Sequence, residues 1–399
     1  MLHARLKENI DWVGVVDWNI RDFHGYETRR GSTYNSYLIR DEATTLIDAV
    51  KAQFADKLLS NVAELTDLKN VRYVVCNHAE PDHSGAMPAV MAAMPSAELV
   101  CDAKCKMALS QHYDTTGWKI RVVADGESLS IGKRTLTFIE TPMVHWPESM
   151  FTYVPQDKLL FSMDAFGQHL ASSGRFDDED DFDVIMAEAK TYYANILMLY
   201  GQSIARTLER VAGLEIDMIA TSHGVIWRKH LDTIIGAYRD WTRLKKKPKV
   251  LVIYDTMWKS TEKMAQAILE GASIEGVDAK LIHIRSASET DIVTEVLDAA
   301  TMAVGSPTLN QTMMPEVAAI LAYLKGLRPA GKAGLAFGSY GWGKGATKDI
   351  EEYLNAMHVQ ILREPVLSQY VPNEGTLQEC RAAGRMLADK AVELARADA

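Results

Sequence analysis

Imidazole and carboxylate side chains crowd into one six-residue segment, His78-Ala-Glu-Pro-Asp-His83. The segment follows an apolar run, Val71 to Cys76, which is typical of a buried strand. A loop that leaves such a strand can turn all four ligand-type side chains toward one point, whereas a strand or helix of this length would spread them over several directions. By itself, the segment fits a polar turn as well as a metal site.

Three more ligand-type residues, His145, Asp164 and His223, each come just after an apolar, strand-like run. A lone histidine is more often packed in a core or at the surface than bound to a metal, but four strand ends with a ligand-type residue at each indicate one shared site. The set holds four imidazoles and three carboxylates: His78, Glu80, Asp82, His83, His145, Asp164 and His223. Seven ligands exceed the four of a structural zinc site, so we expect two ions. A set without thiolates disfavours structural zinc and suits iron or manganese as well as catalytic zinc.

A hydroxyl-rich loop, Tyr254-Asp-Thr-Met-Trp-Lys-Ser-Thr-Glu262, follows an apolar run and leads into a helical pattern. The hydroxyls of Thr256, Ser260 and Thr261, together with the amides at the start of the helix, predict a cradle for an anion. The loop has neither the G-x4-G-K-[ST] nor the G-x-G-x-x-G spacing, and it suits the monophosphate of FMN. The alternative is that the hydroxyls only cap the helix.

Two further loops, residues 305–310 and 338–343, follow strand-like runs of the same region. At the carboxyl ends of a parallel sheet, their backbone polar groups could read the edge of a flavin ring, and Tyr340 or Trp342 could pack on it. The candidate FMN-binding residues of the three loops are Thr256, Met257, Trp258, Ser260, Thr261, Ser306, Pro307, Thr308, Asn310, Ser339, Tyr340, Gly341 and Trp342.

The clearest seam in the chain is the basic run Leu244-Lys-Lys-Lys-Pro-Lys249, which suits an exposed linker. We therefore expect two domains, residues 1–247 and 248–399. After the seam, strand-like runs alternate with helical patterns, which implies an α/β doubly wound parallel sheet of the flavodoxin type. The expected strands there are 250–254, 280–284, 302–304, 334–337 and 359–367, and the expected helices are 260–275, 289–299, 315–327, 347–357 and 377–395.

The part before the seam predicts a sheet-rich α/β layer domain. The expected strands are 32–38, 45–47, 73–76, 98–101, 135–139, 150–154, 159–163 and 218–220, and the most prominent helical pattern is 183–212.

The composition excludes several classes of protein. A net charge of −10 argues against a nucleic-acid partner, which usually requires a basic face. No run approaches the roughly 18 apolar residues of a membrane span, and the N-terminal segment lacks the apolar core of a secretory signal. The four cysteines do not resemble a disulfide framework, and the C-x3-C pair Cys101 and Cys105 fits buried apolar packing better than metal binding. We expect a soluble, cytoplasmic protein.

The order H-x-E-x-D-H, followed by a distant His, Asp and His, resembles the metallo-β-lactamase superfamily, whose hydrolases usually carry histidine where this chain has Glu80. The carboxylate variant resembles the short, two-domain flavodiiron proteins, also called rubredoxin:oxygen oxidoreductases, and the likeness covers essentially the whole chain. Further similar segments are 16–19, 31–37, 145–150 and 192–196. The resemblance implies an N-terminal metallo-β-lactamase-like αββα sandwich and a C-terminal flavodoxin-like domain with bound FMN.

The resemblance also implies roles for single residues. One iron would be held by His78, Glu80 and His145, the other by Asp82, His83 and His223, with Asp164 bridging them. Whether His83 binds stays open, because its counterpart swings away in some relatives. Trp146, His169 and Tyr193 are expected beside the metals, His169 as a hydrogen-bonding group for bound oxygen species and Tyr193 as a source of a proton or an electron. Ordinary packing is the alternative for Trp146 and Tyr193. Lys344 stands where many relatives have a small residue.

The implied activity is the reduction of dioxygen to water, of nitric oxide to nitrous oxide, or of both. Two ferrous ions and a reduced flavin hold the four electrons that dioxygen requires. The expected donor is rubredoxin or a similar small electron carrier, and the expected assembly is a head-to-tail homodimer or a dimer of dimers. We expect dioxygen as the main substrate. The alternatives are an enzyme that is primarily a nitric oxide reductase, a zinc metallo-hydrolase with an added flavodoxin domain, and a non-catalytic electron carrier or redox sensor.

Overall fold

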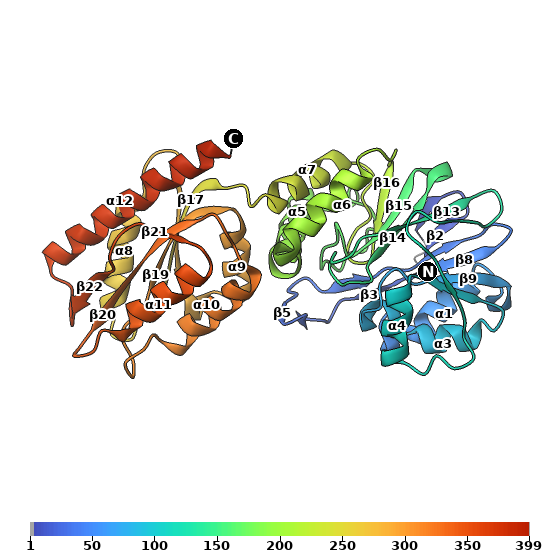
Figure 1. The fold of residues 1–399 in the computed structure, drawn as a ribbon, viewed down its shortest axis with the longest axis horizontal. Coiled ribbons are helices and arrows are strands. Elements are labelled where there is room, and N and C mark those ends of the chain that lie inside the picture. Colours follow the sequence, from blue (N-terminus) through green and yellow to red (C-terminus); the bar gives the residue numbers. More distant parts are fainter. Residues whose placement is uncertain (1–3, 399) are drawn as a thin grey trace. The chain divides into compact units, whose positions relative to one another are not determined.

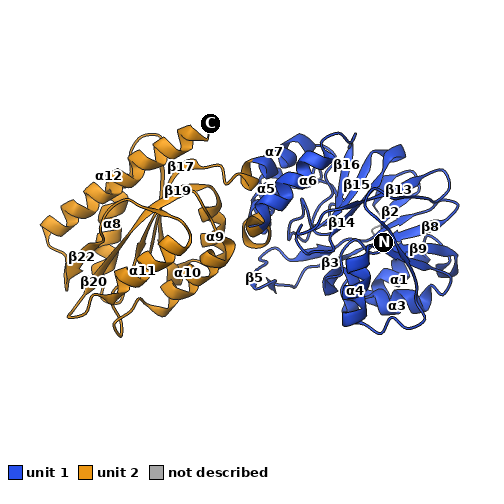
Figure 2. Cartoon of the chain, viewed as in Figure 1, with its two compact units in different colours: residues 1–192, 200–239 blue, residues 193–199, 240–399 orange. Residues whose placement is uncertain are grey.

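The computed structural model describes residues 4–398, which form two compact units. The first contains the described residues up to 192 together with 200–239, and the second contains 193–199 and the described residues from 240 onward (Figure 1, Figure 2). No helix among residues 4–398 is both long enough and apolar enough to cross a bilayer.

A seven-stranded sheet forms one layer of the first unit, in the order β1-β2-β7-β8-β9-β10-β11. Its strands are β1 (Arg5–Lys7), β2 (Ile10–Trp12), β7 (Tyr37–Ile39), β8 (Thr44–Ile47), β9 (Val71–Val75), β10 (Glu98–Cys101) and β11 (Lys119–Val122). The pairs from β8 to β11 are parallel. The helices that follow these strands are α1 (Ala55–Ala63), α2 (Pro81–Ser84), α3 (Met87–Ala93) and α4 (Ala103–His112). Short 3-10 turns precede α1 at Ala52–Phe54 and β9 at Leu68–Asn70.

A five-stranded sheet, in the order β12-β13-β14-β15-β16, forms the next layer. Its strands are β12 (Ser128–Ser130), β13 (Thr135–Glu140), β14 (Met150–Val154), β15 (Leu159–Met163) and β16 (Met218–Thr221), and a 3-10 turn at Pro155–Asp157 joins β14 to β15. Two small ribbons, β3 (Val15–Asp17) with β6 (Ser32–Tyr34) and β4 (Asp22–Phe23) with β5 (Tyr26–Glu27), complete the strands of this unit.

Alternation along the central strand β9 explains the layers. Val74 packs with the apolar residues of α1, α3 and α4, while Val75 packs between the two sheets against residues such as Phe138 and Phe161. Successive side chains of a strand point to opposite faces, so an apolar run buried on both faces must be covered by a helix layer on one side and a sheet on the other. This arrangement confirms the predicted αββα sandwich.

The helical pattern predicted over 183–212 is interrupted. It forms α5 (Phe182–Tyr192), a π-helix (Tyr193–Leu197), a 3-10 turn (Met198–Tyr200) and α6 (Gly201–Val211), and α7 (Leu231–Thr242) follows later in the chain. A π-helical turn adds a residue to the helical repeat and so rotates everything after it, which the apolar periodicity alone does not reveal. Helices α5, α6 and α7 lie beside the second sheet (Figure 1).

The second unit confirms the predicted doubly wound sheet, whose order is β18-β17-β19-β20-β21 with β22 also paired to β20. All of these pairs are parallel. Its elements are β17 (Lys247–Tyr254), α8 (Ser260–Ala272), β18 (Asp278–His283), a 3-10 turn (Ile284–Ser286), α9 (Glu289–Asp298), β19 (Ala299–Gly305), α10 (Pro315–Leu327), β20 (Ala333–Tyr340), α11 (Gly345–Ala356), β21 (Gln360–Ile361), β22 (Val366–Gln369) and α12 (Glu374–Ala397). Helices α8 and α12 pack together on one face of the sheet, with α9, α10 and α11 on the other (Figure 1).

The prediction of an exposed linker over 244–249 is wrong at its end. Strand β17 begins at Lys247, and Lys249 is only 5% exposed. Its Nζ lies 2.6 Å from Asp298 Oδ1 and 3.0 Å from Glu295 Oε2. A buried lysine with two carboxylate partners looks the same in a sequence as a solvated one, so the basic run hid the start of a core strand.

Candidate metal centre and flavin cavity

Four segment ends bring the predicted metal ligands together in the first unit. The turn after β9 carries His78 and Glu80, and Asp82 and His83 lie on the short helix α2, which Pro81 opens. The other three ligands come from the second sheet or its loops: His145 after β13, Asp164 after β15 and His223 after β16. The centre therefore lies where the two sheets meet, at the carboxyl ends of β9, β15 and β16.

Asp164 presents one carboxylate oxygen to each half of the cluster. Its Oδ2 lies 3.2 Å from His78 Nε2 and 3.3 Å from His145 Nε2. Its Oδ1 lies 3.0 Å from His83 Nε2 and 3.4 Å from His223 Nε2. We call His78, Glu80 and His145 the first half of the centre, and Asp82, His83 and His223 the second half.

Each half also has a carboxylate of its own. Glu80 Oε2 lies within 3.2 Å of both Nε2 atoms of the first half, and Asp82 Oδ2 lies within 3.1 Å of both Nε2 atoms of the second half. Atoms that share one octahedral ion at about 2.1 Å are separated by about 3.0 Å, so these spacings fit two cations. His83 points inward like the other three imidazoles, so nothing in its placement excludes it as a ligand.

Buried atoms without hydrogen-bond partners make the same point. Among the described residues they include Asp82 Oδ1 and Oδ2, His83 Nε2, His145 Nε2, Asp164 Oδ1 and Oδ2, and His223 Nε2. Buried polar atoms are almost always paired, and each orphan costs on the order of 1–3 kcal/mol. So many lone pairs gathered at one point would be satisfied together by metal ions.

Two imidazoles are held from behind, which leaves the opposite ring nitrogen to face the centre. His78 Nδ1 lies 2.8 Å from Glu148 Oε1, and His223 Nδ1 lies 2.7 Å from the carbonyl oxygen of Thr33. Such partners fix the orientation and the tautomer of histidines that bind metals. Glu148 escaped the sequence analysis, although it stands three residues after His145 in the same loop.

The charges of the cluster shift one another's protonation. Burial alone would lower the pKa of His83, but Asp82 and Asp164 raise it to about 9. Burial opposes ionisation of Asp164, yet His83, His145 and His78 hold its pKa well below the usual range. The pKa of Glu80 is lowered in the same way, against burial, by His145, His24 and His78. The carboxylates are therefore ionised at neutral pH and offer negative charge to cations.

His24 is a further neighbour of the centre that sequence reasoning missed. It occupies a two-residue turn between β4 and β5, where both His24 and Gly25 have positive φ. Its Nε2 lies 2.7 Å from Glu80 Oε1, so the imidazole holds the oxygen that faces away from the first half. Only the turn pair His24-Gly25 between two short extended stretches hinted at this hairpin.

Aromatic residues surround the imidazoles much as predicted, with one change of position. The Trp146 ring stands edge-on to His78, at 5.2 Å between centroids. The His169 ring is 4.7 Å from that of His223, and burial together with His223 and His24 lowers its pKa well below the usual range.

The tyrosine beside these rings is Tyr192, at 5.1 Å from His169. The structure thus corrects the prediction for Tyr193, which begins the π-helix and packs against Trp241 at 5.2 Å in the second unit.

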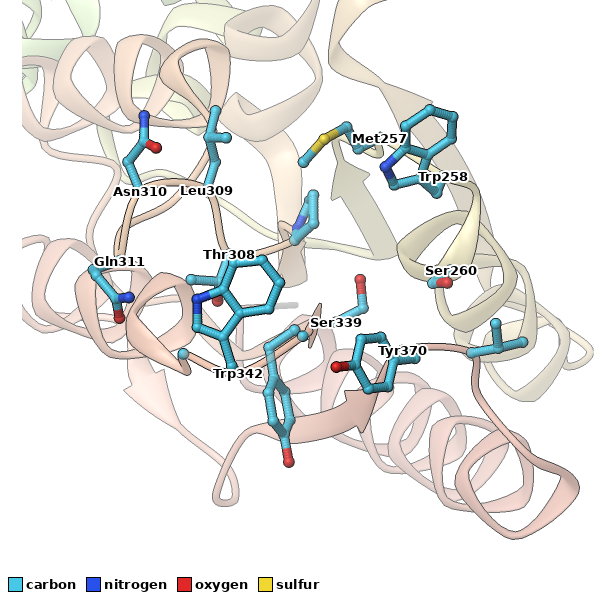
Figure 3. Close-up of a pocket in the computed structure, with 15 residues that line it drawn as sticks. Met257, Trp258, Ser260, Thr308, Leu309, Asn310, Gln311, Ser339, Trp342 and Tyr370 are labelled. Atoms are coloured by element: carbon cyan, nitrogen blue, oxygen red, sulfur yellow. The ribbon is translucent and has the colours of Figure 1, made fainter.

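The second unit contains a cavity of about 680 Å³ at the carboxyl ends of its strands (Figure 3). Such a volume suits a cofactor. Its lining comes from the three predicted loops and includes Met257, Trp258, Ser260, Pro307, Thr308, Asn310, Ser339, Tyr340, Gly341 and Trp342. The lining also includes Leu309, Gln311, Gly343, Tyr370 and Val371, which were not predicted.

The other three predicted residues lie beneath the cavity wall. Thr261 Oγ1 is 2.9 Å from Ser339 Oγ, and Ser306 Oγ accepts a hydrogen bond from Met314 N. Thr256 Oγ1 is buried without a partner among the described residues. A hydroxyl without a partner in the loop between β17 and α8 fits a phosphate, which accepts hydrogen bonds from many directions. The residues present therefore fit the phosphate of FMN.

Comparison with known proteins agrees with both sites. Residues 33–224 match the family described as "ODP family beta lactamase", and residues 252–384 match the family described as "Flavodoxin". The chain is 47% identical to the nitric oxide reductase of Moorella thermoacetica, over 96% of this chain and 97% of that protein. It is 38% identical to the rubredoxin-oxygen oxidoreductase of Megalodesulfovibrio gigas, over 97% and 98%.

A solved structure is similar over the same extent. The flavodiiron protein of Giardia intestinalis superposes with a TM-score of 0.98 and 38% identity, over 100% of this chain and 99% of that one. The resemblance drawn from the sequence is thereby confirmed. Two ligand-rich layers joined to a flavodoxin-like sheet, in one chain this similar to its relatives, show that the protein belongs to the flavodiiron family of oxidoreductases.

Proposed function

We propose that this chain reduces dioxygen to water at a di-iron centre, with electrons that reach it through FMN. The balance is O2 + 4 e⁻ + 4 H⁺ → 2 H2O, with two electrons from two ferrous ions and two from the reduced flavin. One iron would be held by the first half of the centre and the other by the second half, with Asp164 between them. The main support is the placement of Asp164, which offers one oxygen to each half. Each oxygen lies 3.0–3.4 Å from the two Nε2 atoms of its half.

When bound, the two iron ions supply redox equivalents and Lewis acidity. The chain's own residues orient the groups around the centre and exclude water from it. Ser32 Oγ lies 2.7 Å from His169 Nδ1, and His169 Nε2 is buried without a partner. Ser32 Oγ also donates to the carbonyl oxygen of Thr33 at 3.2 Å, and its contact with Nδ1 fixes the orientation of the His169 ring. His169 is thereby a hydrogen-bonding group of fixed orientation beside His223.

Nitric oxide is a second candidate substrate. The relative from Moorella thermoacetica, 47% identical to this chain, is named nitric oxide reductase. The reaction 2 NO + 2 e⁻ + 2 H⁺ → N2O + H2O needs only two electrons, which the same centre can deliver. Anaerobic kinetics with each gas on pre-reduced protein would rank the two substrates, and a kcat/KM for nitric oxide that exceeds the value for dioxygen would reverse our order.

The remaining elements of the proposal concern partners and assembly. Relatives are named rubredoxin-oxygen oxidoreductase and flavorubredoxin, which supports rubredoxin or a similar small carrier as the donor. We also propose a cytoplasmic head-to-tail homodimer, in which the FMN of one subunit serves the irons of the other. Mixing a variant that lacks iron with a variant that lacks FMN would restore activity in such a dimer.

The central test separates flavin reduction from gas consumption. Glu80→Gln and Asp164→Asn should leave the rate of FMN reduction by the donor unchanged, while gas consumption falls to background and bound iron falls below two per chain. Gas consumption that survives both changes would place catalysis elsewhere. If protein purified from cells grown with ample iron contained zinc and no iron, a zinc hydrolase would be favoured instead.

A further inference from the structure

We propose that Glu148 is a positioning residue that gives the two ions of the centre different reduction potentials. The inference rests on the proposed di-iron function. It assigns the lower potential to the ion of the first half, so that this ion is reduced last and oxidised first.

The geometry ties Glu148 to one ligand of the first half. Glu148 Oε1 lies 2.8 Å from His78 Nδ1, and the same oxygen accepts a hydrogen bond from Ala79 N at 3.1 Å. Glu148 is 3% exposed, so water does not weaken the contact. Hydrogen bonds from a ring nitrogen and from a backbone amide to one carboxylate oxygen stabilise the ionised form of that carboxylate. A buried carboxylate therefore stands directly behind one imidazole of the first half.

In the described part of the chain, no carboxylate forms a hydrogen bond to the outer ring nitrogen of either imidazole of the second half. His223 Nδ1 is held by a neutral carbonyl, that of Thr33, at 2.7 Å. His83 Nδ1 is buried without a hydrogen-bond partner. Glu80 and Asp82 balance each other and Asp164 is shared, so among the described residues Glu148 is the carboxylate that distinguishes the halves through a hydrogen bond to a ligand.

A carboxylate behind a ligating histidine increases the basicity of the ring and so favours the more highly charged ion. The reduction Fe³⁺ + e⁻ → Fe²⁺ then becomes harder at the ion bound to His78. One contact works in the opposite direction, since His24 Nε2 lies 2.7 Å from Glu80 Oε1 and draws charge from that ligand. A hydrogen bond is a weaker perturbation than a full buried charge, so we expect the effect of Glu148 to prevail.

Glu148→Gln isolates the charge from the packing. The side-chain carbonyl of glutamine can replace Oε1 and accept from both His78 Nδ1 and Ala79 N, while the negative charge is lost. We expect the preference of the first-half ion for the ferric state to fall about tenfold, which is about 59 mV for one electron. The gap between the two iron potentials should narrow, and the FMN potentials should not move. An anaerobic redox titration that follows the mixed-valence signal by electron paramagnetic resonance measures both.

The matched control is Glu140→Gln. Glu140 and Glu148 both act on Asp102, but it is Glu148 that holds His78. The proposal would be overturned if Glu148→Gln and Glu140→Gln each shifted both iron potentials by the same amount. It would also be overturned if the gap between the two iron potentials were unchanged in Glu148→Gln.

If Glu148→Gln binds less iron than the wild type, the order in which the two ions are lost tests the proposal. The proposal requires the first-half ion to leave first in a chelator competition and Glu148→Asp to recover it in part. Simultaneous loss of both ions, or earlier loss of the second-half ion, would refute the role of Glu148. An active wild-type enzyme whose two irons have equal potentials would reject this inference alone and leave the proposed function standing.

Discussion

The imidazole of His24 holds Glu80 from outside the metal centre, with Nε2 2.7 Å from Oε1, although the two residues are 56 positions apart in the chain. The contact leaves Oε2 of Glu80 as the oxygen that faces the first half. A hairpin of two-residue strands thus restrains a candidate iron ligand.

Replacing His24 by alanine should weaken iron binding in the first half. Loss of a partner that orients a ligand typically costs 10–100-fold in metal affinity or activity, and we expect about tenfold here. Competition with a coloured chelator would measure it. Arg29→Ala, which removes an exposed partner of Glu27 just after the same hairpin, should have no such effect. Equal iron affinity in the two variants would show that the His24 contact restrains nothing.

Arg285 should support the phosphate loop of the flavin site. The carboxylate of Asp255 is fully buried next to Thr256, and Arg285 Nε lies 2.9 Å from its Oδ1. Without the guanidinium, a buried carboxylate would repel the phosphate of FMN at close range. Arg285→Met should raise the Kd for FMN by about tenfold, measured by fluorescence titration of the apoprotein. The control is Lys263→Met, which removes one positive charge from an exposed position of α8. An equal increase in the Kd for FMN in this variant would show that only the net charge matters.

Asp102 gives a prediction of pH dependence. Burial, aided by Glu140 and Glu148, raises its pKa to about 6. The folded state therefore prefers the protonated form, and the stability that this form contributes is lost as the pH rises from about 4 through 6. Asparagine caps a helix as well as aspartate does, so Asp102→Asn should keep the hydrogen bond from Cys105 N and remove the penalty.

We expect this variant to exceed the wild type by about 1–3 kcal/mol at pH 7.5 and by less at pH 4.5, from denaturant midpoints of iron-loaded protein. The exposed cap Asp67→Asn is the control. An advantage that is the same at both pH values would contradict the assignment.

Gly224 should tolerate no side chain. Its φ is +76°, and a Cβ would overlap the side-chain oxygen of Gln168, while its N–H donates to Thr33 Oγ1 at 2.7 Å. Gly224→Ala should therefore displace the adjacent His223 and destabilise the domain by about 1–3 kcal/mol. Thermal unfolding and iron content would record both effects. Gly213→Ala, where a Cβ meets nothing within 4 Å, should change neither.

The sequence predicted those ligands of the metal centre that lie just past the ends of strands. His145, Asp164 and His223 could be grouped with the His78–His83 segment because each follows an apolar run and places a ligand-type side chain just past its end. It failed where a contact depends on a local rotation or on a loop of no fixed pattern. Tyr192 could not be distinguished from Tyr193, because the π-helical turn that separates them leaves no mark in the apolar periodicity.

Other omissions have similar causes. Tyr370 and Val371 line the flavin cavity from beyond β22, a strand of four residues that the sequence suggested only as an extended stretch. Their loop, residues 370–373, contains none of the serines, threonines and glycines that marked the three predicted loops. The ion pairs of Lys249 were hidden because a charged residue at the start of a strand usually faces solvent.

The ligands of the metal centre are divided between two layers, with His78 on the seven-stranded sheet and Asp164 and His223 on the five-stranded one. Two ions bound there would cross-link the two sheets of the sandwich, in addition to any catalytic role. The stability of this domain then depends on the supply of iron. In a cell starved of iron, the metal-free protein would unfold more readily and would be degraded faster by proteases.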